Sequence, residues 1–160
     1  MEAKRYEQLV TKYMDTVFRV AINGTQNIND AEDIVQETFF KLLKAEDTFQ
    51  DEDHIRKWLI RVAINACKDM WRSPWTIRRI SLDEIIEQGT TISSDQSDLF
   101  DAVQRLPTKY REVIYLYYYE EYSIREIAEI LSISETSIQT RLLRARKKLK
   151  EALRRCNYEY

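Results

Sequence analysis

The chain has 160 residues, of which 44% are hydrophobic and only two are glycine and two proline. This length allows one medium domain or two small ones with packed cores, and the scarcity of turn-forming residues favours an all-α fold over an all-β one. The formal net charge of −2 conceals blocks of opposite sign, which the elements below bring out.

Several protein classes are disfavoured by what the sequence lacks. No apolar run approaches the ~20 residues needed to cross a bilayer, and the first ten residues lack a signal-peptide core, so we expect a soluble cytoplasmic protein without direct membrane insertion. Cys67 and Cys156 lie far apart in a chain with one histidine, and we expect no metal site. Without a glycine-rich phosphate loop, a nucleophile elbow or a metalloprotease motif, we expect no enzyme, no cofactor and no small-molecule substrate.

The first two predicted helices are amphipathic. Apolar spacing predicts one over residues 3–23, ended by Gly24, and one over residues 30–44, started by a capping box of Asn29 and Glu32. The buried face of the second is expected to comprise Ala31, Ile34, Val35, Phe39, Leu42 and Leu43. Its opposite face carries Asp30, Asp33, Gln36, Glu37 and Lys41, which by pattern alone indicate a solvated surface.

A polar loop at 45–53, whose single apolar residue is Phe49, leads into a third predicted helix over residues 54–72. Its core stripe is expected at Leu59, Val62, Ala63, Ala66, Cys67 and Met70. A different face carries Trp58, Arg61, Asn65, Lys68 and Arg72. A ring for stacking, an amide for base edges and cations for phosphates suit single-stranded or forked DNA. The pattern alone, however, favours a Trp58 that packs between helices.

Ser73-Pro74 is expected to end the third helix. Residues 76–97 have the composition of a linker, with one short predicted helix at 81–88, and we place the domain boundary there. Helices over residues 99–105 and 108–119 follow, with Pro107 at the first position of the second. The core stripe of that second helix is expected at Tyr110, Val113, Ile114 and Tyr117.

Residues 123–149 have the spacing of a helix-turn-helix. Ser123 and Glu126 form a capping box for its first helix, and Ser134 can cap the second. The buried stripe of the second helix is expected at Ile138, Leu142, Ala145 and Leu149. Its outward face carries Gln139, Thr140, Arg141, Arg144, Lys147 and Lys148, which are able to reach base edges and phosphates. We expect the tail from Glu151 to fray.

Charge distribution favours DNA binding over a plain αα-hairpin. Residues 135–156 hold eight basic and two acidic residues, and residues 54–80 hold seven basic and one acidic. Between these blocks, residues 81–104 hold six acidic residues and no lysine or arginine. Two basic blocks on either side of an acidic stretch predict two DNA-contacting modules joined by a linker that the DNA backbone repels.

These motifs together resemble bacterial RNA polymerase sigma factors of the extracytoplasmic function (ECF) group of the sigma-70 family. The resemblance covers almost the whole chain and rests on three stretches: DAEDIVQETFFKLLK (30–44), WLIRVAINACKDMWR (58–72) and LPTKYREVIYLYYYEEYSIREIAEILSISETSIQTRLLRARKKL (106–149). It implies two small helical domains joined by a flexible acidic linker. Residues 1–75 would be sigma domain 2, residues 76–97 the linker and residues 98–160 sigma domain 4.

The resemblance also implies a role for each surface. Docking on core RNA polymerase would fall to Asp30, Asp33, Gln36 and Glu37. Minus-10 promoter DNA would be held by Trp58, Arg61 and Asn65 with Lys68 and Arg72. The 45–53 loop would capture a flipped base. The resemblance thus implies that Trp58 faces DNA and does not pack between helices. In the minus-35 element, Gln139, Thr140 and Arg144 would meet the bases, with Arg141, Arg146 and Lys147 on phosphates. The position of Gln139 is often arginine in relatives, which leaves its base preference open.

Core polymerase and promoter DNA are therefore the expected partners, together with an anti-sigma factor of the kind that is often membrane-bound. One alternative is a helix-turn-helix regulator that binds an operator, as a dimer and without polymerase, but it gives no use to the Trp58 face or to the Asp30 face. A second alternative, a helical protein-binding adaptor, leaves both basic blocks unexplained.

Overall fold

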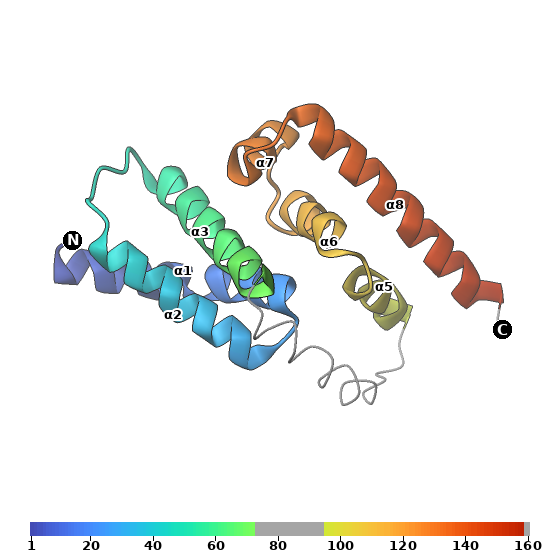
Figure 1. The fold of residues 1–160 in the computed structure, drawn as a ribbon, viewed down its shortest axis with the longest axis horizontal. Helices are drawn as coiled ribbons and strands as arrows, with labels where there is room; N and C mark the ends of the chain where they lie inside the picture. Colours follow the sequence, from blue (N-terminus) through green and yellow to red (C-terminus); the bar gives the residue numbers. More distant parts are fainter. Residues whose placement is uncertain (73–94, 159–160) are drawn as a thin grey trace. The chain divides into compact units, whose positions relative to one another are not determined.

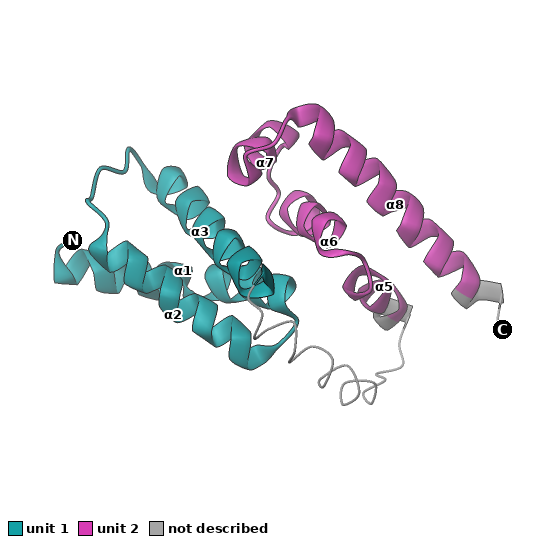
Figure 2. Cartoon of the chain, in the orientation of Figure 1, with its two compact units in different colours: residues 1–84 teal, residues 85–160 magenta. Residues whose placement is uncertain are grey.

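The computed structural model describes residues 1–72 and 95–158. Over these residues every regular element is a helix, which confirms the expected all-α class (Figure 1). The chain divides into two compact units, Met1–Glu84 and Ile85–Tyr160 (Figure 2). The helix expected at 81–88 and most of the expected linker at 76–97 lie outside the described residues.

Unit 1 contains three helices, α1 (Ala3–Thr25), α2 (Ile28–Lys44) and α3 (Glu52–Arg72), each packed against the other two. Apolar stripes supply the core, and the buried residues of α1 and α2 include Leu9, Val17, Val20, Ala21, Ala31, Ile34, Val35, Phe39 and Leu42. The expectation that Leu43 joins this core is wrong. Because a helix turns by about 100° per residue, Leu43 lies beyond the stripe that ends in Leu42, and its side chain is exposed.

Gly24 lies inside α1 rather than at its end. The helix continues to Thr25 and ends where Gln26 adopts a left-handed conformation (φ 55°), with the Gln26 N–H donating to the carbonyl of Ile22. A Cβ at Gly24 would come within 2.7 Å of the Cys67 Sγ on α3, and the Trp71 Nε1–H donates to the Gly24 carbonyl at 2.9 Å. Gly24 therefore permits a close approach of α1 and α3.

The starts of α2 and α3 also differ from expectation. Asn27, not Asn29, caps α2, because its side-chain oxygen accepts the Asp30 N–H at 3.0 Å. Asp51 accepts the His54 N–H at 2.8 Å, and α3 begins at Glu52, two residues earlier than predicted. The buried side of α3 comprises Ile55, Leu59, Ile60, Ala63, Ile64, Ala66 and Cys67. Of the predicted stripe, Val62 and Met70 are only half-buried.

Unit 2 contains α5 (Asp95–Gln104), α6 (Thr108–Ile114), the π-helical turn η1 (Tyr115–Tyr119), α7 (Ile124–Leu131) and α8 (Glu135–Tyr158). The helix α8 packs against α5, α6 and α7. It continues to Tyr158, so the expectation that the chain frays from Glu151 is wrong for the described residues.

The helix predicted over 108–119 changes its winding part-way. It is α-helical to Ile114 and then π-helical, with the Glu120 N–H donating to the Tyr115 carbonyl five residues earlier at 3.1 Å. Pro107 precedes the helix as its N-cap residue instead of occupying the first helical position. The expected stripe is buried at Tyr110, Val113 and Ile114, whereas Tyr117 is half-buried.

Candidate nucleic-acid interfaces

The five residues expected to contact minus-10 DNA lie along one face of α3. They follow one another at intervals of three and four residues, so they form a row on the side opposite the buried stripe: Trp58, Arg61, Asn65, Lys68 and Arg72. Arg61, Asn65 and Arg72 are exposed, while Trp58 and Lys68 are half-buried. The row offers one aromatic ring, one amide and three cations along about 20 Å of helix.

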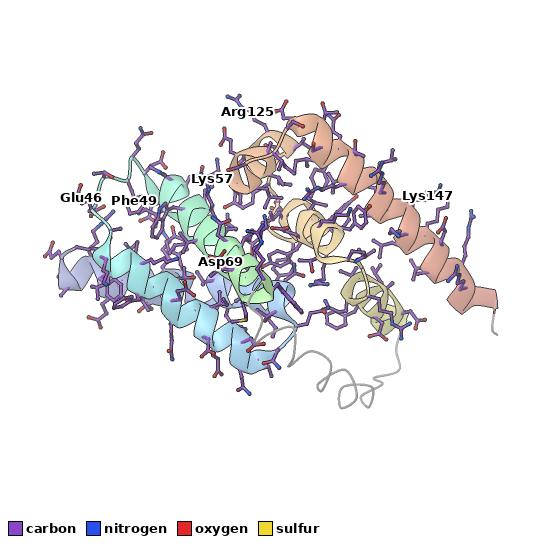
Figure 3. The ribbon with its side chains drawn as sticks, viewed as in Figure 1. Glu46, Phe49, Lys57, Asp69, Arg125 and Lys147 are labelled. Atoms are coloured by element: carbon purple, nitrogen blue, oxygen red, sulfur yellow. The ribbon has the colours of Figure 1, made fainter. Side chains whose placement is uncertain are left out.

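An aromatic cluster extends this row into the preceding loop. The Phe49 ring meets Trp58 edge to face, with centroids 5.4 Å apart, and meets His54 in the same manner at 5.2 Å. Figure 3 shows Phe49 and Glu46 in this loop between α2 and α3. From the sequence, Phe49 is only an apolar residue in a polar loop. The missed signal is its spacing, because Phe49 comes shortly before a helix whose first turns present His54 and Trp58.

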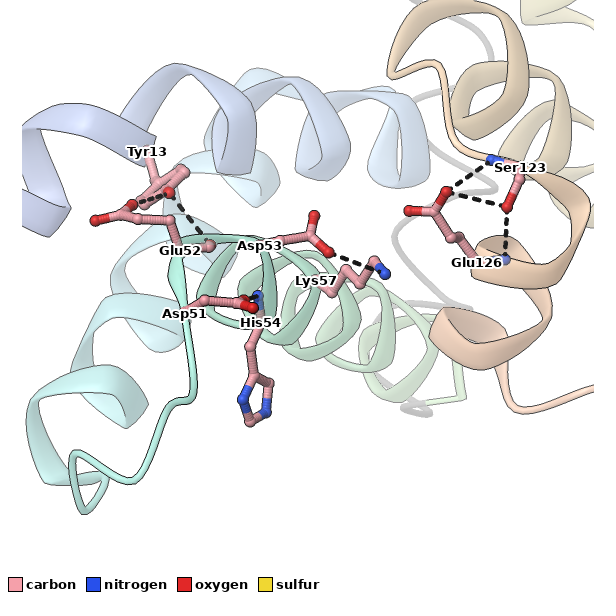
Figure 4. A network of polar contacts seen from close by, with 8 residues as sticks. All are labelled: Tyr13, Asp51, Glu52, Asp53, His54, Lys57, Ser123 and Glu126. Carbon is pink, nitrogen blue, oxygen red and sulfur yellow. Dashed lines mark hydrogen bonds and ion pairs between the residues drawn. The ribbon is translucent and has the colours of Figure 1, made fainter.

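The loop is anchored to α1 by charged contacts. Arg5 Nε and Asp47 Oδ2 form an ion pair at 2.5 Å. Glu52 accepts the Tyr13 hydroxyl at 2.5 Å and pairs with Lys12 Nζ at 2.9 Å, and Figure 4 shows the Tyr13 contact. The hydrogen bond from Tyr13, followed by that from Lys12, lowers the pKa of Glu52 below its ordinary value. The aromatic cluster is therefore held by contacts at both ends of the loop.

The expected polymerase-docking face of α2 is acidic, with an exposed aromatic ring at its C-terminal end. Asp33, Gln36 and Glu37 are exposed and Asp30 is half-buried. Phe40 follows Glu37 by three residues and Gln36 by four, so it shares their face, and its side chain is 54% exposed. The sequence analysis did not assign Phe40. An exposed large ring within an acidic face suits a protein partner better than DNA, because phosphates repel the carboxylates.

In unit 2 the helix-turn-helix forms as predicted. Ser123 and Glu126 make both hydrogen bonds of the capping box, which Figure 4 shows. The helix α7 ends at Ser132, whose φ of 56° is left-handed, and Ser134 Oγ accepts the Ser137 N–H at 3.1 Å to start α8. The predicted core residues Ile138, Leu142 and Ala145 are buried, and Leu149 is half-buried. The α8 surface is thus held on a fixed scaffold.

The expected minus-35 residues spread around the exposed side of α8. Gln139, Arg144, Arg146 and Lys147 are exposed, and Thr140 and Arg141 are half-buried; Lys147 projects away from the helix in Figure 3. Measured across the outer face, Arg141 and Arg146 are separated by about 220° around the helix axis. The structure therefore brings Thr140, Arg144 and Lys147 together on the outer face and leaves Arg141 and Arg146 on opposite flanks of it.

Two more features of α8 bear on DNA contact. Leu143 is 67% exposed within this polar and basic surface, and the sequence analysis did not single it out. The Thr140 hydroxyl donates to the Thr136 carbonyl at 2.9 Å, so its methyl group and its oxygen lone pairs remain for contact. Both side chains offer apolar groups of the kind that meet a thymine methyl.

Two observations on the described residues concern membrane spanning and metal binding. None of the described helices is long and apolar enough to span a membrane. Within residues 1–72 and 95–158, no group of three or more His, Cys, Asp or Glu side chains is arranged to hold a metal ion. Cys67 is buried, as expected for a small core residue.

Comparison with known protein families gives two matches in order along the chain. The model described as Sigma-70 region 2 matches residues 9–80, and the one described as Sigma-70, region 4 matches residues 97–149. The first match contains α2, the loop and the α3 row, and the second contains the helix-turn-helix.

Individual relatives support the same family assignment. The RNA polymerase sigma factor SigV of Bacillus subtilis is 32% identical over 141 residues, which cover 86% of this chain and 84% of SigV. The ECF RNA polymerase sigma factor SigW of the same organism is 29% identical over 166 residues, covering 93% and 89%. In fold, the chain is similar to the sigma factor RpoE of Bartonella quintana in its complex with the anti-sigma factor NepR, with a TM-score of 0.70, 24% identity and coverage of 95% and 98%.

Proposed function

Because the chain belongs to the sigma-70 family of bacterial RNA polymerase sigma factors, in its ECF group, we propose which of its surfaces performs each step of promoter recognition. The protein associates with RNA polymerase and directs promoter-specific initiation, and it is not an enzyme. The observation that carries this conclusion is the match to region 2 as well as region 4. A helix-turn-helix regulator acting without polymerase has no use for region 2.

The α3 row and the adjoining loop are proposed to open the minus-10 element. Trp58 supplies a ring on which a base at the edge of the duplex stacks, Asn65 an amide for a base edge, and Arg61, Lys68 and Arg72 cations for the backbone. The edge-to-face contact of Phe49 with Trp58 supports this assignment, since it fixes the ring beside the loop that would capture the flipped base. Flipping costs a few kcal/mol per base, which these contacts must offset.

Strand opening by this surface needs no nucleotide hydrolysis. A protein shifts an equilibrium by its differential affinity for the two states. An aromatic ring binds an unstacked base and gains nothing from one that remains in the duplex. The proposed surface therefore favours the melted form by binding alone.

The helix α8 is proposed to read the minus-35 element in the major groove. Gln139, Thr140 and Arg144 would meet base edges, and Arg141, Arg146 and Lys147 would meet phosphates. Support comes from the capped helix-turn-helix that holds α8 and from the exposure of Gln139 and Arg144. The opposite flanks occupied by Arg141 and Arg146 suit contacts to the two backbones that border one groove.

The α2 face is proposed as the docking surface for core polymerase, through Asp30, Asp33, Gln36 and Glu37. Its exposed acidic groups and the exposed Phe40 ring that follows them support a protein partner. The proposed domains are residues 1–75, which dock on core polymerase and open the minus-10 element, and residues 98–160, which read the minus-35 element. The proposed linker at 76–97 lies between them in the sequence.

An anti-sigma factor is the further proposed partner. The fold is similar to that of RpoE, which was crystallised with the anti-sigma factor NepR. Because bacterial polymerase works in the cytoplasm, we place the function of this protein there, with retention at the membrane wherever its anti-sigma factor is membrane-bound.

Transcription in vitro from genomic DNA tests the proposed function. Core polymerase from the source organism is supplied with and without the chain, and the RNA 5′ ends are mapped. We expect discrete starts that require both proteins and that share two sequence elements upstream. Absence of such starts, with active core and folded protein, would support the operator-binding regulator instead.

A further inference from the structure

Arg146 of α8 is fixed by two tyrosines of η1. Its Nε–H donates to the Tyr118 hydroxyl at 2.6 Å. Its guanidinium carbon lies 5.5 Å from the centroid of the Tyr118 ring and 5.6 Å from that of Tyr117. A long, flexible side chain is thus held by one hydrogen bond and two cation–π contacts.

The π-helical winding of η1 accompanies this arrangement. Tyr117 and Tyr118 are consecutive, and their rings meet edge to face with centroids 4.9 Å apart. In the widened turn both rings reach the same guanidinium. Tyr118 is 55% exposed, so the core has little need of its ring, and π-helical turns are frequent at functional sites.

The position of Arg146 on α8 is suited to the DNA backbone. It follows Gln139 by seven residues, which places it on the same flank two turns later, about 10 Å along the axis. A helix that reads bases with the residues near its N-terminus meets the edge of the groove further along. Arg146 would therefore lie where the phosphates are, beyond the bases that Gln139 faces.

The polar groups left over also fit a phosphate. Within residues 1–72 and 95–158, the Tyr118 hydroxyl is the hydrogen-bond partner of Arg146, and no carboxylate pairs with the guanidinium. The two Nη atoms keep their N–H groups as a fork, the geometry that binds phosphate oxygens. Tyr118 accepts from Arg146, so its own O–H is left to donate.

We propose that Tyr118 is a positioning residue that holds Arg146 for a DNA phosphate at the minus-35 element and donates a hydrogen bond from its hydroxyl to the same phosphate. This rests on the proposed role of α8 and adds a residue outside the helix-turn-helix to its DNA surface. Arg146 and Tyr118 form a preformed donor pair. Because the Arg146 side chain is already ordered, DNA binding does not incur the entropy cost of ordering it.

The test compares holoenzymes that carry the full chain as wild type, Tyr118→Phe, Arg146→Ala, or both changes. Their affinity for a duplex bearing only the upstream element of a mapped promoter is measured over a series of salt concentrations. We expect Tyr118→Phe to weaken binding about 3- to 10-fold with an unchanged salt dependence, because the charge remains. Arg146→Ala should weaken it about tenfold and reduce the salt slope by about 0.9. Tyr118→Phe should add nothing in the Arg146→Ala background.

Matched controls distinguish a positioning role of Tyr118 from a role in folding or in the recognition of bases. Tyr119→Phe removes a hydroxyl from a similarly exposed ring that stacks on Tyr115, and it should leave affinity unchanged. The loss caused by Tyr118→Phe should be equal on specific and unrelated duplexes, since a phosphate carries no sequence information.

Five outcomes would overturn the proposal. Unchanged affinity in Tyr118→Phe would do so, as would a loss confined to particular base pairs or a loss accompanied by a lower melting temperature of the protein. If Tyr118→Phe instead reduced binding to core polymerase or to another protein, the donor pair would serve a protein carboxylate. Failure of the wild-type holoenzyme to bind any mapped upstream element would overturn the role of α8 itself and this inference with it.

Discussion

Replacement of Trp58 by alanine should separate promoter opening from promoter binding. Base–aromatic stacking contributes roughly 1–3 kcal/mol per base, so its loss should lower the equilibrium between open and closed promoter about 5- to 150-fold. The same change removes the edge-to-face contact with Phe49, which contributes about 0.5–1.5 kcal/mol to folding. Phe49→Ala removes the same contact but keeps the Trp58 ring, so its smaller loss of opening measures the part that comes from fixing the ring and not from stacking on a base.

Permanganate reactivity of promoter thymines measures opening, and a filter or mobility assay measures binding, both with saturating holoenzyme. With Trp58→Ala, we expect the promoter thymines to lose their permanganate reactivity, while the holoenzyme largely keeps its binding to closed duplex and the chain its binding to core polymerase. A template whose minus-10 region is already mismatched should restore its transcription. Equal loss of core binding and opening, or no rescue by the mismatched template, would refute the proposed stacking and leave Trp58 as a residue of the fold.

Three further predictions follow from unit 1. Changing Asp33 and Glu37 to lysine should weaken binding to core polymerase about tenfold or more by reversing the charge of the α2 face, and unchanged affinity in a pull-down titration would remove that face from the docking surface. Gly24→Ala should destabilise the protein by about 1–2 kcal/mol in urea unfolding despite the better helix propensity of alanine, and Cys67→Ala should relieve much of this loss; purely additive losses would contradict the close approach. The pKa of Glu52 is lowered in the folded state, so its ionised carboxylate should stabilise the protein above its ordinary pKa of 4.5, and this stabilisation should disappear as the pH falls through the lower folded value. Glu52→Gln should therefore reduce the dependence of the free energy of unfolding on pH in the acid range. An unaltered pH dependence would count against the contact of Glu52 with Tyr13 and Lys12.

The elements that were predicted correctly are those whose signals are local. The capping box of Ser123 and Glu126 involves neighbours on one turn, and both of its bonds form. Where two residues of equal chemistry compete, the local rule fails. Asn27 and Asn29 are both good caps, and the structure uses the earlier one, because α2 begins two residues sooner than the apolar pattern alone indicates.

Contacts between helices account for most of the other differences. The sequence pattern places a helix end at Gly24, yet Gly24 lies within α1, where the absence of a Cβ permits the close approach of Cys67, more than forty residues later in the sequence. The π-helical winding of Tyr115–Tyr119 is likewise not indicated by the apolar pattern of residues 108–119, and it coincides with contacts to Arg146 on α8. Contacts between helices that are far apart in the sequence cannot be predicted from the spacing of residues along one helix.

The positions of the candidate residues on the helices follow from the sequence where helical spacing decides them, and less so elsewhere. The α3 row from Trp58 to Arg72 follows from the helical period and is found on one face. Phe49, Phe40 and Leu143 were not assigned because an apolar residue near a polar face reads as core or as chance, and only their exposure and ring contacts reveal them. The roles of all these residues remain predictions.

Base preference in the upstream element gives the most direct test of the division between the two units. A library randomised in that element is transcribed by holoenzyme carrying either the wild-type chain or Gln139→Arg, and the RNA is sequenced. Glutamine pairs with adenine and arginine with guanine, each worth about 1–3 kcal/mol of discrimination. We predict a switch from adenine to guanine at one upstream position, with the preferences in the minus-10 element unchanged. An unaltered preference, or a change in the minus-10 element, would contradict the assignment of α8 to upstream base reading.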